Sequence, residues 1–220
     1  MNHRALRAAC GLMVGCLAFG GRSFADTVFS NFGPLDTFNT QDGFPVSGPK
    51  SLLGQSITVA MGFTSPGNFT LSQIDVAVSY FAGVNDVVLT LNTDSGGIPG
   101  AIMESWTLTG LPNFGSDYAP LTLTSVPGVR LDAGQIYWLE ASAGEPTNLS
   151  VWNQNSIGET GTIDEYFSGG WHEFSNRAQG AFDVIGAAAT PEPASAALIG
   201  FGLLGIGGIL RRKRRQMSRL

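Results

Sequence analysis

Ile74-Asp75-Val76-Ala77-Val78-Ser79-Tyr80 decides the fold, because Ile, Val and Tyr occupy every second position of it. A period of two places alternate side chains on opposite faces of an extended chain, so this stretch predicts a β-strand with one buried face. The same alternation recurs between residues 26 and 190, where no window of eleven residues has a helical period. Further strands are predicted over 57–63, 87–91, 102–108, 121–124, 136–141, 149–153 and 181–185.

Turn-forming residues separate these segments, as in Asp94-Ser95-Gly96-Gly97 and Ser168-Gly169-Gly170. Glycine reaches the positive φ angles that tight turns require, and Asp and Ser bond to the turn backbone. About eight to ten short strands in one domain are typical of an antiparallel β-sandwich of jelly-roll type. We therefore expect an all-β body over 26–186, followed by a short linker over 187–190.

Charge is segregated along the chain. The whole chain of 220 residues has a net charge of −5, yet residues 26–190 alone hold sixteen acids and three bases. Such an acidic body repels phosphate backbones, so nucleic acid is not expected as a partner. Cys10 and Cys16 are the only cysteines, so the predicted body has no thiol for catalysis or for a disulfide.

The amino-terminal segment has the features of a secretory signal peptide. Arg4 and Arg7 precede an apolar run over 8–20, and Ser23-Phe24-Ala25 supplies small residues before Asp26. This order predicts that residues 1–25 are removed by signal peptidase, with cleavage after Ala25.

The carboxy-terminal segment has the features of a membrane anchor. Residues 194–210 are seventeen positions without a charge, which is near the lower limit for a transmembrane helix. A basic cluster follows directly, and it predicts a cytoplasmic end with a short tail over 216–220. The body then lies on the far side of the inner membrane, in agreement with the signal peptide. The cluster consists of Arg211, Arg212, Lys213, Arg214 and Arg215.

Pro191-Glu192-Pro193 stands immediately before this apolar span. Pro193 disfavours helical geometry at Glu192, so the tripeptide is expected to be extended and accessible. The order of tripeptide, glycine-rich apolar span and basic cluster over 191–215 resembles the PEP-CTERM sorting signal of Gram-negative bacteria. The resemblance implies that an exosortase recognises Pro191, Glu192 and Pro193 while the chain is transiently held in the inner membrane. It also implies a cell-surface or extracellular location and a link to exopolysaccharide and biofilm.

Several segments of the body also resemble the choice-of-anchor domains, which are extracellular β modules. The similar segments are 92–100, Trp106, 131–139, 151–153 and 180–186. This resemblance implies an extracellular location and a β fold, and it implies no chemistry.

The residues give little support to catalysis. His172 is the only histidine between 26 and 190, and no G-x-S-x-G sequence is present to supply a serine nucleophile. A glycoside hydrolase needs only two carboxylates, and Asp164, Glu165 and Glu173 lie near aromatic residues. With sixteen acids such neighbours are expected by chance, so this remains a remote alternative. We expect no enzyme and no cofactor.

A metal site is not predicted either. Asn92-x-Asp94-x-Gly96-Gly97 begins like a calcium-binding EF-hand loop, but Gly96 and Met103 occupy positions that need oxygen ligands. The segment therefore predicts a hairpin turn, and any calcium dependence is left open.

Aromatic and amide side chains late in the body suit sugar binding, because rings stack on sugars and amides bond to hydroxyls. The candidate residues are Trp171, Tyr166, Trp152 and Asn153. Trp152 lies in a strand-like run that equally suits the core, whereas Trp171 follows two glycines. We thus expect an exported structural or adhesive protein, with a carbohydrate-binding module as the alternative. The ligand, the oligomeric state and re-attachment after processing are left open.

Overall fold

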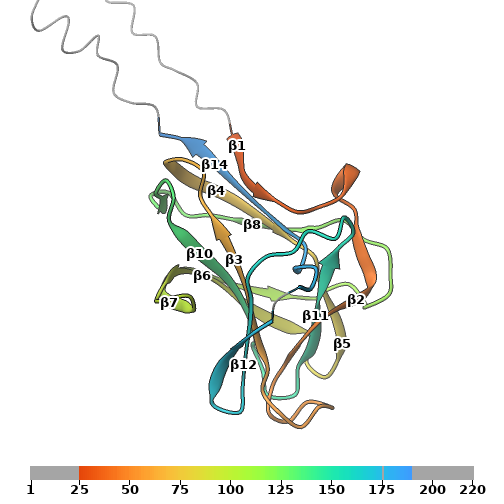
Figure 1. The fold of residues 1–220 in the computed structure, drawn as a ribbon. Helices are drawn as coiled ribbons and strands as arrows, with labels where there is room; N and C mark the ends of the chain where they lie inside the picture. The colour runs from red at the N-terminus through yellow and green to blue at the C-terminus, as the bar shows by residue number, and fades with distance from the viewer. Residues whose placement is uncertain (1–24, 175, 190–220) are drawn as a thin grey trace, which may run out of the picture.

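The computed structural model describes residues 25–174 and 176–189, which form an all-β body (Figure 1). Fourteen strands lie in this part of the chain, and all pairings between them are antiparallel. The predicted antiparallel all-β class is confirmed, whereas the jelly-roll type stays a prediction. The predicted transmembrane helix, Pro191 to Pro193, the basic cluster and all but the last residue of the predicted signal peptide lie outside the described residues.

A six-stranded sheet forms one layer of the body. Its central strands are rich in alternating apolar residues, as the sequence predicts, and its two edges are β13 and β7. The strand order is β13 (Gly170–Glu173), β12 (Ile163–Phe167), β3 (Thr58–Thr64), β10 (Ile136–Ala143), β6 (Asp86–Asp94) and β7 (Pro99–Thr109).

Two smaller sheets complete the body. One has the order β1 (Ala25–Ser30), β14 (Phe182–Ala188), β4 (Phe69–Val76) and β8 (Leu121–Thr124), with β9 (Arg130–Leu131) also paired to β4. The other has the order β2 (Phe38–Ser47), β11 (Leu149–Asn155) and β5 (Val78–Ala82), and the short 3-10 helix η1 (Pro34–Asp36) precedes β2.

The two smaller sheets meet at a junction of three backbones, formed by Ala77, Asn153 and Ala181. The amide of Ala77 donates to the carbonyl of Ala181 at 3.1 Å, and the amide of Asn153 donates to the carbonyl of Ala77 at 2.8 Å. The amide of Ala181 in turn donates to the carbonyl of Asn153 at 2.8 Å. The prediction of a single strand over 74–80 is therefore wrong. The segment divides at Ala77 into β4 and β5, because the backbone of Ala77 bonds to both Ala181 and Asn153 where the two sheets separate.

The side chain of Asn153 ties further segments to this junction. Its Oδ1 accepts hydrogen bonds from Ser79 Oγ at 2.7 Å and from the Tyr118 hydroxyl at 2.9 Å. Its Nδ2 donates to the carbonyl of Asn39 at 3.0 Å. Asn153 is 0% exposed, so these bonds are made without competition from water.

One hydrophobic core lies between the sheets, and all three contribute to it. Phe44 of β2, Ile74 of β4 and Leu89 of β6 are among its completely buried members. A core to which every sheet contributes is typical of one domain, and a second, smaller cluster of Phe32, Ala77 and Ala181 lies at the junction.

Several strands were not predicted from the sequence or extend beyond their predicted bounds. β2 contains Gly43 and Pro45, which weaken a strand pattern, and β12 and β13 are too short to show one. β14 continues to Ala188, so the first two residues of the predicted linker belong to a strand that pairs with Thr70 and Phe69.

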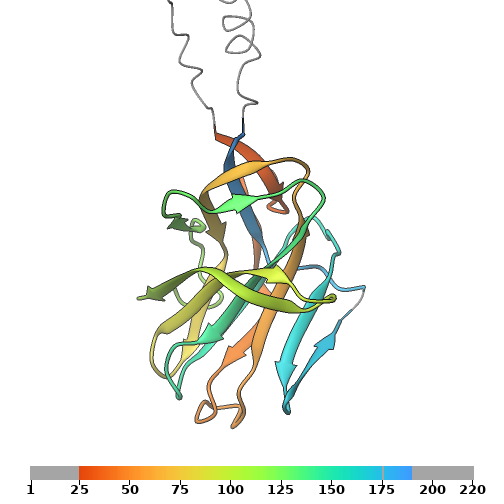
Figure 2. The same ribbon diagram turned by 90° about the vertical axis from the view of Figure 1, so that its left-hand side faces the viewer.

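The two ends of the body lie side by side (Figures 1 and 2). β1 runs antiparallel to β14, with Ala25 opposite Ala187 and Asp26 opposite Gly186. Within the described residues, no helix is long and apolar enough to cross a membrane.

Replacing Asn153 with Ala should destabilise the body, because Tyr118, Ser79 and the carbonyl of Asn39 would lose a buried partner. We expect the free energy of unfolding to fall by about 3 kcal/mol, measured by urea denaturation with tryptophan fluorescence. Asn113→Ala, at an exposed position, is the matched control and should change stability by less than about 0.5 kcal/mol. Equal stability of the two variants would contradict the role assigned to Asn153.

Candidate functional site

The hairpin of β12 and β13 brings four of the candidate side chains onto one face. Its turn has positive φ at both central residues, 53° at Ser168 and 87° at Gly169, which is the geometry of a two-residue primed turn. The resulting register places Tyr166 opposite Trp171 and Asp164 opposite Glu173. Since alternate residues of a strand share a face, these four side chains form one surface, which we call the hairpin face.

Tyr166 and Trp171 form an aromatic pair on the hairpin face. Their ring centroids lie 5.4 Å apart with an interplanar angle of 67°, and Tyr166 is 40% exposed. His172 points to the other side of the hairpin and stacks on Phe167 at 4.2 Å. The structure therefore brings two of the predicted sugar-binding residues together at the surface.

The other two predicted sugar-binding residues are not at the surface. Trp152 is completely buried, its Nε1 donates to the carbonyl of Ala181 at 3.1 Å, and its ring packs on Phe182. Asn153 belongs to the junction described above. Neither can contact a polymer outside the body, because every second residue of β11 faces the core, and Asn153 is covered by the segments that it bonds. The candidate site thus narrows to the hairpin face.

Two carboxylates lie beside the aromatic pair. Asp164 is only 2% exposed and its Oδ2 has no hydrogen-bond partner within residues 25–174 and 176–189, whereas Glu173 is exposed. Burial, and then the charge of Glu173, raise the pKa of Asp164 to about 6. Glu165 lies on the opposite side of β12, where burial raises its pKa and the charge of Arg177 opposes that rise.

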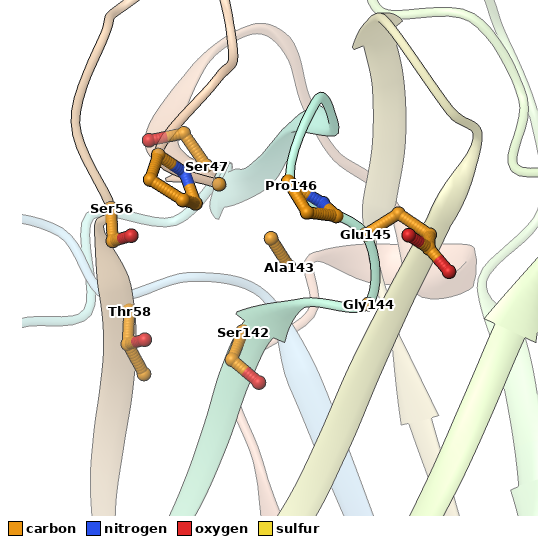
Figure 3. A pocket seen from close by; sticks show the side chains of 10 residues that line it. Ser47, Ser56, Thr58, Ser142, Ala143, Gly144, Glu145 and Pro146 are labelled. Atoms are coloured by element: carbon orange, nitrogen blue, oxygen red, sulfur yellow. The ribbon is translucent and has the colours of Figure 1, made fainter.

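A cavity of about 210 Å³ lies between the start of β3 and the end of β10 (Figure 3). Ser56 and Thr58 line one wall and Ser142 lines the other, while the carboxylate of Glu145 is turned away from it. Thr58 stands directly opposite Tyr166 between β3 and β12. Hydroxyl groups therefore continue the hairpin face toward the middle of the sheet.

Sequence reasoning did not identify Thr58 or Ser142. Both alternate with core residues along their strands, but so do many surface residues of a sheet. Only the pairing of β12 with β3 shows that Thr58 neighbours an aromatic side chain.

Asp94 serves the turn between β6 and β7. Its carboxylate accepts hydrogen bonds from the amides of Gly96 and Gly97 and from Trp138 Nε1 at 2.8 Å. The predicted hairpin turn is confirmed by the pairing of Asp94 with Pro99. Among the described residues, no group of three or more His, Cys, Asp or Glu side chains could hold a metal ion.

The last of the described strands, β14, ends just before the predicted sorting segment. The amide of Ala189 donates to the carbonyl of Asn68 at 2.9 Å, and Ala188 pairs with Phe69. Only Thr190 separates Ala189 from Pro191. All of the observed pairing of β14 therefore lies on the body side of the tripeptide.

Comparison with known families identifies this segment. The family model described as the PEP-CTERM protein-sorting motif matches residues 189–215, which confirms the recognition made from the sequence. The chain is thus exported, targeted to an exosortase, and sorted at the membrane toward the cell surface. No curated protein and no solved structure matches the chain, so the resemblance of the body to choice-of-anchor domains stays a prediction.

Asp164→Asn should stabilise the protein at neutral pH. The folded-state pKa of about 6 lies above the ordinary 3.8, so the folded protein holds this proton more tightly than the unfolded chain. Stability is therefore greatest below the unfolded-state pKa and falls as the pH rises through 6. The amide mimics the protonated form, so we expect a gain of about 1 kcal/mol at neutral pH after solvent screening.

Thermal unfolding across the pH range measures this effect. The difference between Asp164→Asn and the parent should disappear as the pH falls below about 4. Glu159→Gln changes an exposed acid and should show no such dependence. A gain for Asp164→Asn that is the same at every pH would contradict the interpretation.

Proposed function

We propose that this protein, once processed by the exosortase, acts as a structural or adhesive component of the cell surface or extracellular matrix, linked to exopolysaccharide or biofilm. The observation that supports this most directly is the sorting motif itself, which matches residues 189–215 and begins directly after β14 ends at Ala188. Cleavage near Pro191 to Pro193 would leave all of the described strands in the body.

In this proposal, residues 194–210 hold the chain transiently in the inner membrane, and Arg211 to Arg215 keep its end in the cytoplasm. Signal peptidase would cut after Ala25, at the first residue of β1. The start of β1 lies beside the end of β14, so the signal peptide and the sorting segment would be attached at the same end of the body (Figures 1 and 2). The turn of the β12–β13 hairpin lies toward the opposite end, where it would face away from the membrane.

We propose a non-catalytic role for the body. Asp164 and Glu173 are the acids considered above for a glycoside hydrolase, but a general acid must reach the leaving oxygen within hydrogen-bond distance. The Oδ2 atom of Asp164 is enclosed by protein. The stacking of His172 on Phe167 likewise supports a structural role for that side chain.

A carbohydrate-binding module is the second candidate function, and the hairpin face favours it. Tyr166 and Trp171 supply rings for stacking. Thr58, which is paired with Tyr166, lines a cavity to which Ser56 and Ser142 also contribute hydroxyls. A cavity of about 210 Å³ is smaller than the usual range for drug-sized ligands. The arrangement therefore suits one residue of an extended polymer.

Replacing Glu192 with Ala should block processing, because the exosortase would lose the charged residue of its recognition tripeptide. We expect the uncleaved precursor to accumulate in the membrane fraction, detected by immunoblot and by intact mass. Glu159→Ala makes the same charge change on the body and should be processed normally. Normal release of the Glu192→Ala protein would overturn the assignment of the tripeptide.

Replacing Trp171 with Ala should weaken retention on the exopolysaccharide of the producing cells. Loss of one stacked ring corresponds to roughly tenfold weaker binding, measured by co-sedimentation with the purified polymer. Phe81→Ala removes another exposed aromatic side chain and serves as the control. Equal retention of both variants and the parent would exclude the hairpin face as the binding site.

A further inference from the structure

The hairpin face contains two acidic side chains and no basic side chain. Asp164 and Glu173 stand directly opposite each other, an arrangement in which like charges repel. Burial and Glu173 both raise the pKa of Asp164, and no neighbouring group lowers it. Asp164 is only 2% exposed, and its Oδ2 has no hydrogen-bond partner among the residues that the structure describes.

The nearest charged groups on other elements do not neutralise this pair. Glu140 of β10 lies two strands away on the same sheet, is itself acidic, and accepts a hydrogen bond from Asn92 at 2.8 Å. Arg177 lies over the ring of Phe44 at 4.8 Å and acts on Glu165 at the opposite side of β12. The face therefore presents the exposed carboxylate of Glu173 to whatever binds there, with the buried Asp164 opposite it.

The aromatic pair indicates which kind of cation could balance these charges, a metal ion or an organic ammonium group. Calcium takes six to eight oxygen ligands, and Tyr166 and Trp171 would supply little to such a shell. An organic ammonium group instead gains from a ring face and from a carboxylate together. Its carbon skeleton can also stack on the second ring. The combination of two rings and two carboxylates fits an ammonium-bearing sugar better than a metal ion.

We propose that the hairpin face binds a polymer of amino sugars that carry free amines. Glu173, which is exposed, contacts the ammonium group, Tyr166 and Trp171 hold the sugar ring, and Asp164 adds negative charge from beneath. Thr58 and the cavity that it lines receive the hydroxyls of the neighbouring sugar. This inference rests on the carbohydrate-binding function proposed above and narrows it to one class of polymer.

Three oligosaccharides of equal length test the proposal by calorimetric titration of the mature protein. They are a β-linked glucosamine oligomer, its fully N-acetylated form, and a uronic acid oligomer. We expect the glucosamine oligomer to bind at least about tenfold more tightly than the acetylated form, because acetylation removes the positive charge. The uronic acid oligomer should not bind, because its charge has the sign of the site.

Variants of the hairpin face identify the groups responsible. Glu173→Gln should abolish the preference for the free amine, and Trp171→Ala should weaken both glucosamine forms. Tyr166→Phe keeps the ring and should retain affinity, whereas Tyr166→Ala should lose it. Glu159→Gln is the matched control, because it removes one exposed acid elsewhere on the body.

The possible failures are distinguishable. If the acetylated form binds as tightly as the free amine, the amino-sugar proposal is overturned while carbohydrate binding stands. If no oligomer binds, both proposals fail. If Glu159→Gln weakens binding as much as Glu173→Gln does, the attraction is a general property of the acidic body, and the site is overturned. Binding of calcium alone, with loss in Glu173→Gln and no effect of any oligomer, would likewise overturn it.

Discussion

The three backbone hydrogen bonds among Ala77, Asn153 and Ala181 are the constraint on which the arrangement of the body depends. They join the two smaller sheets into one layer opposite the six-stranded sheet, so both can contribute to a single core. They also determine where β14 begins, since Phe182 follows the junction directly. From there β14 runs to Ala188 between β1 and β4, and this course brings the carboxy-terminal end of the body beside its amino-terminal end.

The strand order of the six-stranded sheet determines where the hairpin face lies on the body. β13 is the edge strand, β12 follows, and β3 and β10 supply the hydroxyl-lined cavity beside them. Because the two ends of the described body lie opposite the β12–β13 turn, attachment through these ends and the binding proposed for the hairpin face would use separate surfaces (Figure 1). This separation lets the sorting segment follow the body after a single residue without restricting what the body can bind.

Much of the fold could be predicted from alternation alone, but the site could not. Period two identified β6, β10 and most of β3 and β7, because each has one face in the core. It failed at Ala77, where alternation continues although the chain passes from one sheet to another. Trp152 and Asn153 have the aromatic and amide side chains that suit a sugar site, but burial depends on which strands cover β11, and that information is non-local. The pairing of Tyr166 with Trp171 is different, because the turn residues Ser168 and Gly169 imply it, and a hairpin could have been predicted there.

The direction of β14 has a mechanical consequence. If the body is pulled through its carboxy-terminal end while a polymer holds the opposite end, the force acts along the strand axis. The pairs that β14 makes with β1 and β4 are then loaded in shear, so they bear the tension simultaneously and cannot open one after another like a zipper. A domain built in this way resists extension most strongly along the axis of β14.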